Sequence, residues 1–197
     1  TPVLVPGSFP QYIIDHTRAI LPATPIVTYD PGTEYVSCQS LLTPTAGVNY
    51  GYHPWLAGAI DRLPAAEDSG FSDRIYISRR STSSLRLFEN AAQIEAIALE
   101  AGLQVVYPED HPLERQIGLF RKARLVVGEF GSGLHNTVFS LPGTRVFCLN
   151  RGNCLQSRIA RLKGQSIGYL LPAGGQAVTW DSPPVGQPRF TMEPERF

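Results

Sequence analysis

The stretch from Leu125 to Asn136 constrains the fold of this chain more than any other part of the sequence. An apolar run, Leu125–Val127, opens into a loop with glycines at positions 128, 131 and 133, and we predict that a helix follows from Asn136 to Phe139. Glycine lets the backbone approach a ligand closely, and the start of a helix offers unpaired N–H groups to an anion. Open α/β folds tend to bind nucleotides at such junctions, at the carboxyl ends of parallel strands. The stretch therefore predicts an α/β protein that handles phosphate.

The spacing of these glycines excludes two common phosphate-binding motifs. No Gly-Lys-Ser/Thr sequence closes the loop, so it is not a Walker A motif. The order Gly128-x-x-Gly131-x-Gly133 reverses the spacing of the Rossmann dinucleotide fingerprint, which makes a nicotinamide-dependent oxidoreductase a poor interpretation. Taken alone, the loop is explained equally well as a tight turn that needs glycine for steric reasons.

Length and charge narrow the classes of protein further. The 197 residues suffice for one sizeable core, or for one domain and a smaller partner. Residues 1–73 carry 2 Arg and 7 Asp or Glu, a balance of −5, whereas residues 74–163 carry 13 Arg or Lys and 7 Asp or Glu, a balance of +6. The asymmetry favours a small anionic ligand in the second part, although a general preference for arginine on solvated surfaces explains it as well. No basic stripe alternates with aromatic residues, so we expect no nucleic-acid partner.

Cysteine usage and hydropathy bear on the compartment. Cys38, Cys148 and Cys154 are odd in number and lack metal-ligand spacing, which favours buried thiols in a reducing compartment over a disulfide or zinc framework. The uncharged run at 41–60 is broken by Pro, Gly, Thr and Asn, so we expect no transmembrane segment. We predict a cytoplasmic protein, with the inner face of the membrane as an alternative location.

Predicted strands and helices alternate from residue 74 onward. Helices of about 10–12 residues between apolar strands argue for βαβ units on one parallel sheet. Predicted helices lie at 12–21, 54–63, 91–101, 112–123 and 155–162, and predicted strands at 26–29, 35–42, 75–77, 103–107, 125–127, 145–149 and 167–171. The predicted organisation is a smaller N-terminal α/β part at 1–63, a linker at 64–73, a Rossmann-like domain at 74–180 and an extended tail at 181–197.

Two polar segments follow predicted strands of that domain. Ser78-Arg79-Arg80 comes directly after the strand at 75–77, where an arginine could neutralise a diphosphate; for an isolated Arg-Arg pair, a solvated loop is the better interpretation. Glu109 and Asp110 follow the strand at 103–107 and could contact a sugar hydroxyl, or Asp110 could cap the next helix. The four histidines are each interpreted as structural or exposed: His16, His53, His111 and His135.

Read together and in this order, these segments resemble glycosyltransferase family 61. The resemblance covers residues 74–150 well and residues 1–63 more loosely, through Tyr52-His53-Pro54. No single motif is specific, but the order and the gaps of the whole series are. The matching segments are Tyr76-Ile77-Ser78-Arg79-Arg80, Asn90, Val105-Val106-Tyr107-Pro108-Glu109-Asp110, Leu113, Gln116-Ile117, Phe120, Ala123, Val126-Val127-Gly128-x-x-Gly131-Ser132-Gly133-Leu134-x-Asn136 and Pro142-Gly143-Thr144.

The resemblance implies inverting transfer of a sugar from a nucleotide-sugar donor to a polysaccharide or glycolipid acceptor, as in capsule biosynthesis. It also implies a GT-B-like fold of paired Rossmann-type domains, so residues 74–180 become the nucleotide-sugar-binding domain and residues 1–63 the acceptor side. Carried over by position, Arg79 holds the donor diphosphate and stabilises it as it leaves. The other donor-binding residues implied are Ser78, Arg80, Glu109, Gly131, Ser132, Gly133 and Asn136.

Two departures from the family pattern concern catalysis. The family usually has His where this chain has Phe130, and often has Glu where this chain has Ala91. We therefore nominate Glu129, beside Phe130, as the general base that inversion requires. The alternative is a non-catalytic nucleotide- or sugar-binding module. The chain has no Asp-x-Asp motif, and GT-B enzymes often work without one, so no cofactor is predicted and the metal requirement is open.

Overall fold

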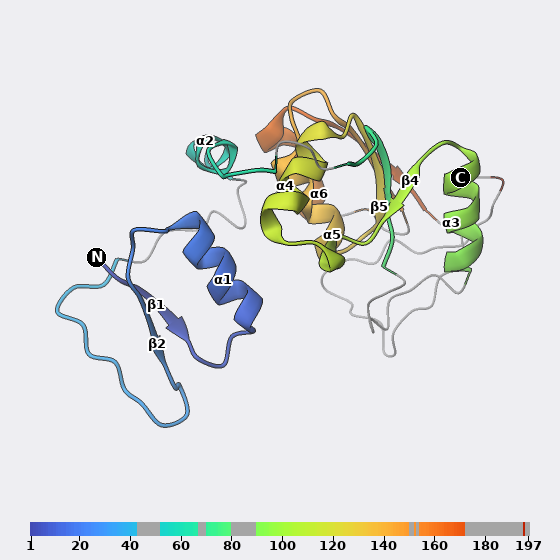
Figure 1. Ribbon diagram of the computed structural model, residues 1–197. Helices are drawn as coiled ribbons and strands as arrows, with labels where there is room; N and C mark the ends of the chain where they lie inside the picture. Colours follow the sequence, from blue (N-terminus) through green and yellow to red (C-terminus); the bar gives the residue numbers. More distant parts are fainter. Residues whose placement is uncertain are drawn as a thin grey trace. The chain divides into compact units, whose positions relative to one another are not determined.

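The computed structural model describes residues 1–42, 52–66, 70–79, 90–149, 152, 154–171 and 195 (Figure 1). Contacts within the chain divide it into two compact units, Thr1–Ala46 and Gly47–Phe197. The predicted linker at 64–73 and the domain limits built on it stay a prediction, and the predicted tail at 181–197 lies outside the described residues except for position 195.

The first unit is a small βαβ motif. It consists of β1 (Val3–Pro6), α1 (Gln11–Ile20) and β2 (Ile26–Tyr29), and the two strands pair in parallel with Val3 opposite Ile26. The strand predicted at 35–42 is wrong, because these residues have no regular structure and are exposed. β-branched and aromatic residues form a strand only where a neighbouring edge pairs with them, and within the described residues this run pairs with no strand.

The second unit is built on a parallel five-stranded sheet. Its strands are β3 (Arg74–Ile77), β4 (Gln104–Val106), β5 (Leu125–Glu129), β6 (Arg145–Leu149) and β7 (Ser166–Leu170), in the order β4-β3-β5-β6-β7. The chain steps from β3 outward to β4 and then returns to place β5 on the other side of β3. The strand order therefore reverses between β3 and β5, which is the switch point where open parallel sheets bind ligands. The predicted parallel α/β sheet is confirmed, whereas the GT-B pairing stays a prediction.

Helical segments connect these strands. They are α2 (Trp55–Asp61), α3 (Ala91–Glu100), η1 (Pro108–Asp110), α4 (Leu113–Lys122), α5 (Ser132–His135), η2 (Asn136–Phe139) and α6 (Cys154–Lys163). The helices predicted at 91–101, 112–123 and 155–162 are confirmed to within a residue or two at each end. The helix predicted from Asn136 begins earlier, at Ser132, so half of the predicted glycine loop is helical.

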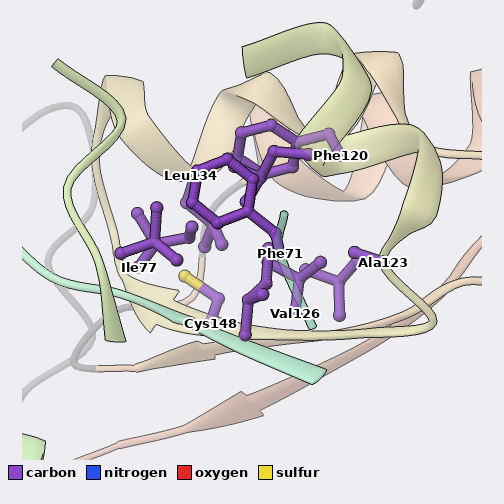
Figure 2. Close-up of a cluster of buried hydrophobic side chains, with 11 residues drawn as sticks. Phe71, Ile77, Phe120, Ala123, Val126, Leu134 and Cys148 are labelled. Atoms are coloured by element: carbon purple, nitrogen blue, oxygen red, sulfur yellow. The ribbon is translucent and has the colours of Figure 1, made fainter. Parts of the chain in front are cut away.

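The two faces of the sheet pack against different helices. Alternate side chains of a strand point to opposite faces. On one face, Ile77 and Val126 pack against Phe120 of α4 and Leu134 of α5, together with Cys148 (Figure 2). On the other face, the cluster is formed by Tyr76, Val127, Leu149 and the buried side of α3, and Figure 1 shows α3 across the sheet from α4. Each fully buried large apolar side chain contributes about 1.5–3 kcal/mol, so this two-sided core holds the strand ends rigidly.

The C-terminal end of α2 is held by two cations of the second unit. The guanidinium Nη2 of Arg121 donates to the carbonyls of Asp61 and Leu63 at 2.9 Å each. The buried ammonium of Lys163 pairs with the carboxylate of Asp61. Cations near a helix C-terminus satisfy its last carbonyl groups. These contacts fix α2, and the segment Tyr52–Pro54 that precedes it, to α4 and α6.

Candidate functional site

The site lies where β3 and β5 end, at the switch point of the sheet. The guanidinium Nη1 of Arg79, two residues after β3, donates to the carbonyl of Phe130 at 3.0 Å. This contact joins two segments that lie 51 residues apart in the sequence. A Cβ atom on Gly131 would lie 1.5 Å from Nη1 of Arg79. The guanidinium therefore occupies the space that a side chain at position 131 would need, and it would have to move to admit one.

The other two glycines of the stretch have packing roles. Gly128 lies within β5, and a Cβ atom there would lie 2.9 Å from Cβ of Ile77. A Cβ atom on Gly133, in α5, would lie 3.3 Å from Ile77 and 4.0 Å from Pro108 of η1. Steric crowding therefore explains the glycine at position 128. Gly133 lies close to Ile77 of β3 and near Pro108, which follows β4.

His135 completes the group around Arg79. It occupies the last position of α5, its ring makes an edge contact with the ring of Phe130 at 5.6 Å between centroids, and its Nε2 is buried. Nε2 has no hydrogen-bond partner among the residues that the structure describes. Burial, and then the charge of Arg79, lower the pKa of His135, so the imidazole is neutral. We interpreted this histidine from sequence as structural or exposed, and its position beside Arg79 had no local signal.

Glu129, the predicted base, has a side chain that is only 1% exposed. Glu129 lies two residues after Val127 on β5, so the two side chains share a face. That face is the α3 side of the sheet, where Tyr76 lies. Burial raises the pKa of Tyr76 above its ordinary range, and the negative charges of Glu129 and Glu95 raise it further. The guanidinium of Arg79, by contrast, contacts the backbone of Phe130 and Gly131 just beyond the end of β5.

A buried carboxylate that sequence reasoning missed holds the ends of β3 and β4. Glu95 of α3 accepts a hydrogen bond from the hydroxyl of Ser78 at 2.5 Å and another from the hydroxyl of Tyr107 at 3.0 Å. Ser78 is buried and donates to Glu95, which fixes the backbone that leads into Arg79; its predicted contact with the donor stays a prediction. The signal was available, because the helical spacing puts Glu95 on the apolar side of α3, with Ala91 and Ala98.

The remaining predicted donor-binding residues differ in their exposure and hydrogen bonds. Ser132 is exposed at the first position of α5, and Glu109 is exposed in η1. The side-chain amide of Asn136 donates to Gln116 of α4 at 2.9 Å. Asp110 does not cap α4, whose N-cap is Pro112. Arg80 lies outside the described residues.

Two further findings concern metal ligands and membrane-spanning helices in the described part of the chain. Within it, no three His, Cys, Asp or Glu side chains gather in a way that could hold a metal ion. Each helix found there is too short or too polar to cross a lipid bilayer.

Comparison with known proteins gives one match. Residues 3–147 match a family model described as Glycosyltransferase 61. No curated protein is detectably similar to the chain. The matched region includes most of the first compact unit and the part of the second up to residue 147. It therefore contains β3, β5 and the segments with Arg79, Phe130 and Gly131.

Proposed function

Since the chain belongs to glycosyltransferase family 61, we propose that it moves a sugar, with inversion, from a nucleotide-sugar donor to a hydroxyl of a polysaccharide or glycolipid. Membership of the family establishes a glycosyltransferase domain, whose substrates are a nucleotide-sugar donor and a glycan acceptor. A capsular polysaccharide is the acceptor we favour, because the resemblance of the motif series is to capsule-biosynthesis proteins.

The observation that carries the proposal is the guanidinium of Arg79 at the switch point. Its Nη1 rests on the carbonyl of Phe130 and against Gly131. Arginine matches the geometry of a phosphate with two parallel N–H donors. Negative charge develops on the donor diphosphate as the sugar leaves, and a fixed cation stabilises that charge in the transition state. Arg79 is therefore the group that binds the diphosphate and assists its departure.

The proposal assigns the general base to Glu129. An inverting transfer needs a group that removes the proton from the acceptor hydroxyl as that hydroxyl attacks. Glu129 ends β5 and directly precedes Phe130, to which Arg79 is bonded. Its carboxyl group lies close enough to Tyr76 for its charge to raise the pKa of that phenol, which places it on the α3 side of the strand end.

Nucleoside diphosphates titrated against the wild type and Arg79→Ala test the donor site. Loss of one charged hydrogen-bonding partner costs about 1.5–3 kcal/mol, so we expect affinity to fall about 10- to 150-fold. Arg124→Ala is the matched control, because Arg124 is exposed at the opposite end of β5. Equal binding by the wild type and Arg79→Ala would overturn the assignment of the donor site.

A non-catalytic nucleotide- or sugar-binding module is the second candidate, and the burial of Glu129 favours it. Chromatographic detection of donor hydrolysis or sugar transfer separates the two functions. Turnover by the wild type that is abolished in Glu129→Gln, with nucleotide binding retained, rejects the module. Nucleotide binding without any turnover supports it.

A further inference from the structure

Phe130 orients two side chains at once. Its carbonyl accepts the hydrogen bond from Nη1 of Arg79 at 3.0 Å, and its ring holds the imidazole of His135 edge-on. The backbone carbonyl of Gly131 also accepts the backbone N–H of His135 at 3.2 Å, which fixes the main chain at His135. Arg79 and His135 are therefore both fixed at the end of β5, although they come from different parts of the chain.

Burying the Nε2 atom of His135 costs free energy, because it loses its hydrogen bond to water. Buried polar atoms in folded proteins nearly always have a hydrogen-bond partner, and Nε2 has none among the described residues. The nearby charge of Arg79 also opposes protonation of the ring. A group of this kind next to a fixed cation is suited to an anionic ligand that satisfies both residues together.

We propose that His135 is a second phosphate-binding side chain of the site, whose Nε2 donates to a diphosphate oxygen when that diphosphate lies against Arg79. The inference rests on the proposed function, because it takes the same diphosphate at Arg79. Neutral imidazole with its proton on Nε2 already supplies this donor. The negative charge of the bound diphosphate also favours imidazolium, so we expect the pKa of the ring to rise as the ligand binds.

The charges around His135 oppose protonation of the free imidazole, so the negative charge that would favour imidazolium comes from the bound diphosphate. Of the elements that pack against α5, β5 contributes Glu129, which faces Tyr76, and η2 has no charged side chain. Helix α6 contributes cations, of which Lys163 is paired with Asp61. The other two are Arg158 and Arg161. A bound diphosphate screens Arg79 and adds negative charge, and both changes favour imidazolium.

Histidine NMR tests the inference directly, because the chain has four histidines and His135→Gln identifies the signal of interest. The pKa of each imidazole is measured with and without saturating inorganic pyrophosphate. We expect the pKa of His135 to rise by about one unit or more, as an adjacent opposite charge produces, while His16 and His53 do not change. Circular dichroism of each variant reports that it is folded.

Binding by two variants provides a second measurement. His135→Leu removes the donor, whereas His135→Gln keeps an N–H group near the position of Nε2. We expect pyrophosphate to bind His135→Leu about tenfold more weakly than the wild type, and His135→Gln to recover part of that loss. The inference is overturned if pyrophosphate binding depends on Arg79 but leaves the His135 signal unchanged, and the proposed function then stands. Absence of pyrophosphate binding by the wild type would overturn both.

Discussion

Replacing Gly131 with alanine tests the geometry of the site with a single methyl group. The added Cβ would lie 1.5 Å from Nη1 and 2.7 Å from Cζ of Arg79. Ordinary contact between a carbon atom and a guanidinium nitrogen begins at about 3.5 Å, so the guanidinium must move by about 2 Å. The hydrogen bond from Arg79 to Phe130 is then lost, and Arg79 no longer presents its donors to a diphosphate.

The expected effect on binding is large and the effect on stability is small. A charged hydrogen bond is worth about 1.5–3 kcal/mol, which corresponds to about a 10- to 150-fold loss of affinity for a nucleoside diphosphate. Arg79 is partly exposed, so its displaced head can be hydrated by water. We therefore expect the free energy of unfolding of Gly131→Ala to stay within about 1 kcal/mol of the wild type.

Calorimetric titration with nucleoside diphosphates gives the affinity, and urea unfolding gives the stability. Gly58→Ala is the control, because Gly58 is exposed in α2 and the nearest atom to its added Cβ, in Arg62, is 4.0 Å away. That variant should bind like the wild type. A folded Gly131→Ala variant that binds nucleoside diphosphates as tightly as the wild type would refute the assignment of Arg79 and Gly131 to one diphosphate site.

The remaining predictions concern the support of the site. Gly128→Ala brings a Cβ to 2.9 Å from Cβ of Ile77, within paired strands, so we expect urea unfolding to show a loss of about 1–3 kcal/mol. Glu95→Ala leaves two hydroxyl donors without their acceptor and should cost about 1–3 kcal/mol in the same assay, with weaker diphosphate binding because both strand ends are loosened. Buried thiols were expected from sequence, but Cys38 and Cys154 are exposed and only Cys148 is buried. Burial raises the pKa of Cys148 to about 12, so at pH 8 a thiol reagent should label the two exposed cysteines quickly and Cys148 only on unfolding. Fast labelling of all three cysteines would contradict this prediction.

Local sequence patterns were sufficient where an element's own residues determine its structure. The strand at 145–149 was predicted with the bounds of β6, because an apolar run between turn residues has one stable conformation in a buried sheet. The run at 35–42 has similar composition but forms no strand. The difference lies in pairing, since a strand also needs a neighbour that its own sequence does not encode.

The glycine-rich stretch shows why the site was only partly predictable. Its contact with Arg79 could be anticipated from sequence, because both segments follow buried strands whose carboxyl ends meet at one edge, whereas anion binding there stays a prediction. The start of α5 at Ser132 was missed, because Gly133 has a low helix propensity and reads as loop. In the fold, a Cβ at this position would lie 3.3 Å from the side chain of Ile77, so close tertiary packing favours glycine there despite its low helix propensity.

The separation of charged groups across β5 argues for a division of roles within the site. In an inverting displacement the nucleophile attacks the face of the sugar carbon opposite to the leaving group. Arg79 and His135 both lie with Phe130 beside α5, whereas Glu129 faces Tyr76 on the side of α3. A base on the same side as the diphosphate would face the bond that breaks, so under the proposed function His135 would serve the leaving phosphate and Glu129 the attacking hydroxyl. The leaving group would then be held by a residue that follows β3 and one on α5, and the base would come from the end of β5.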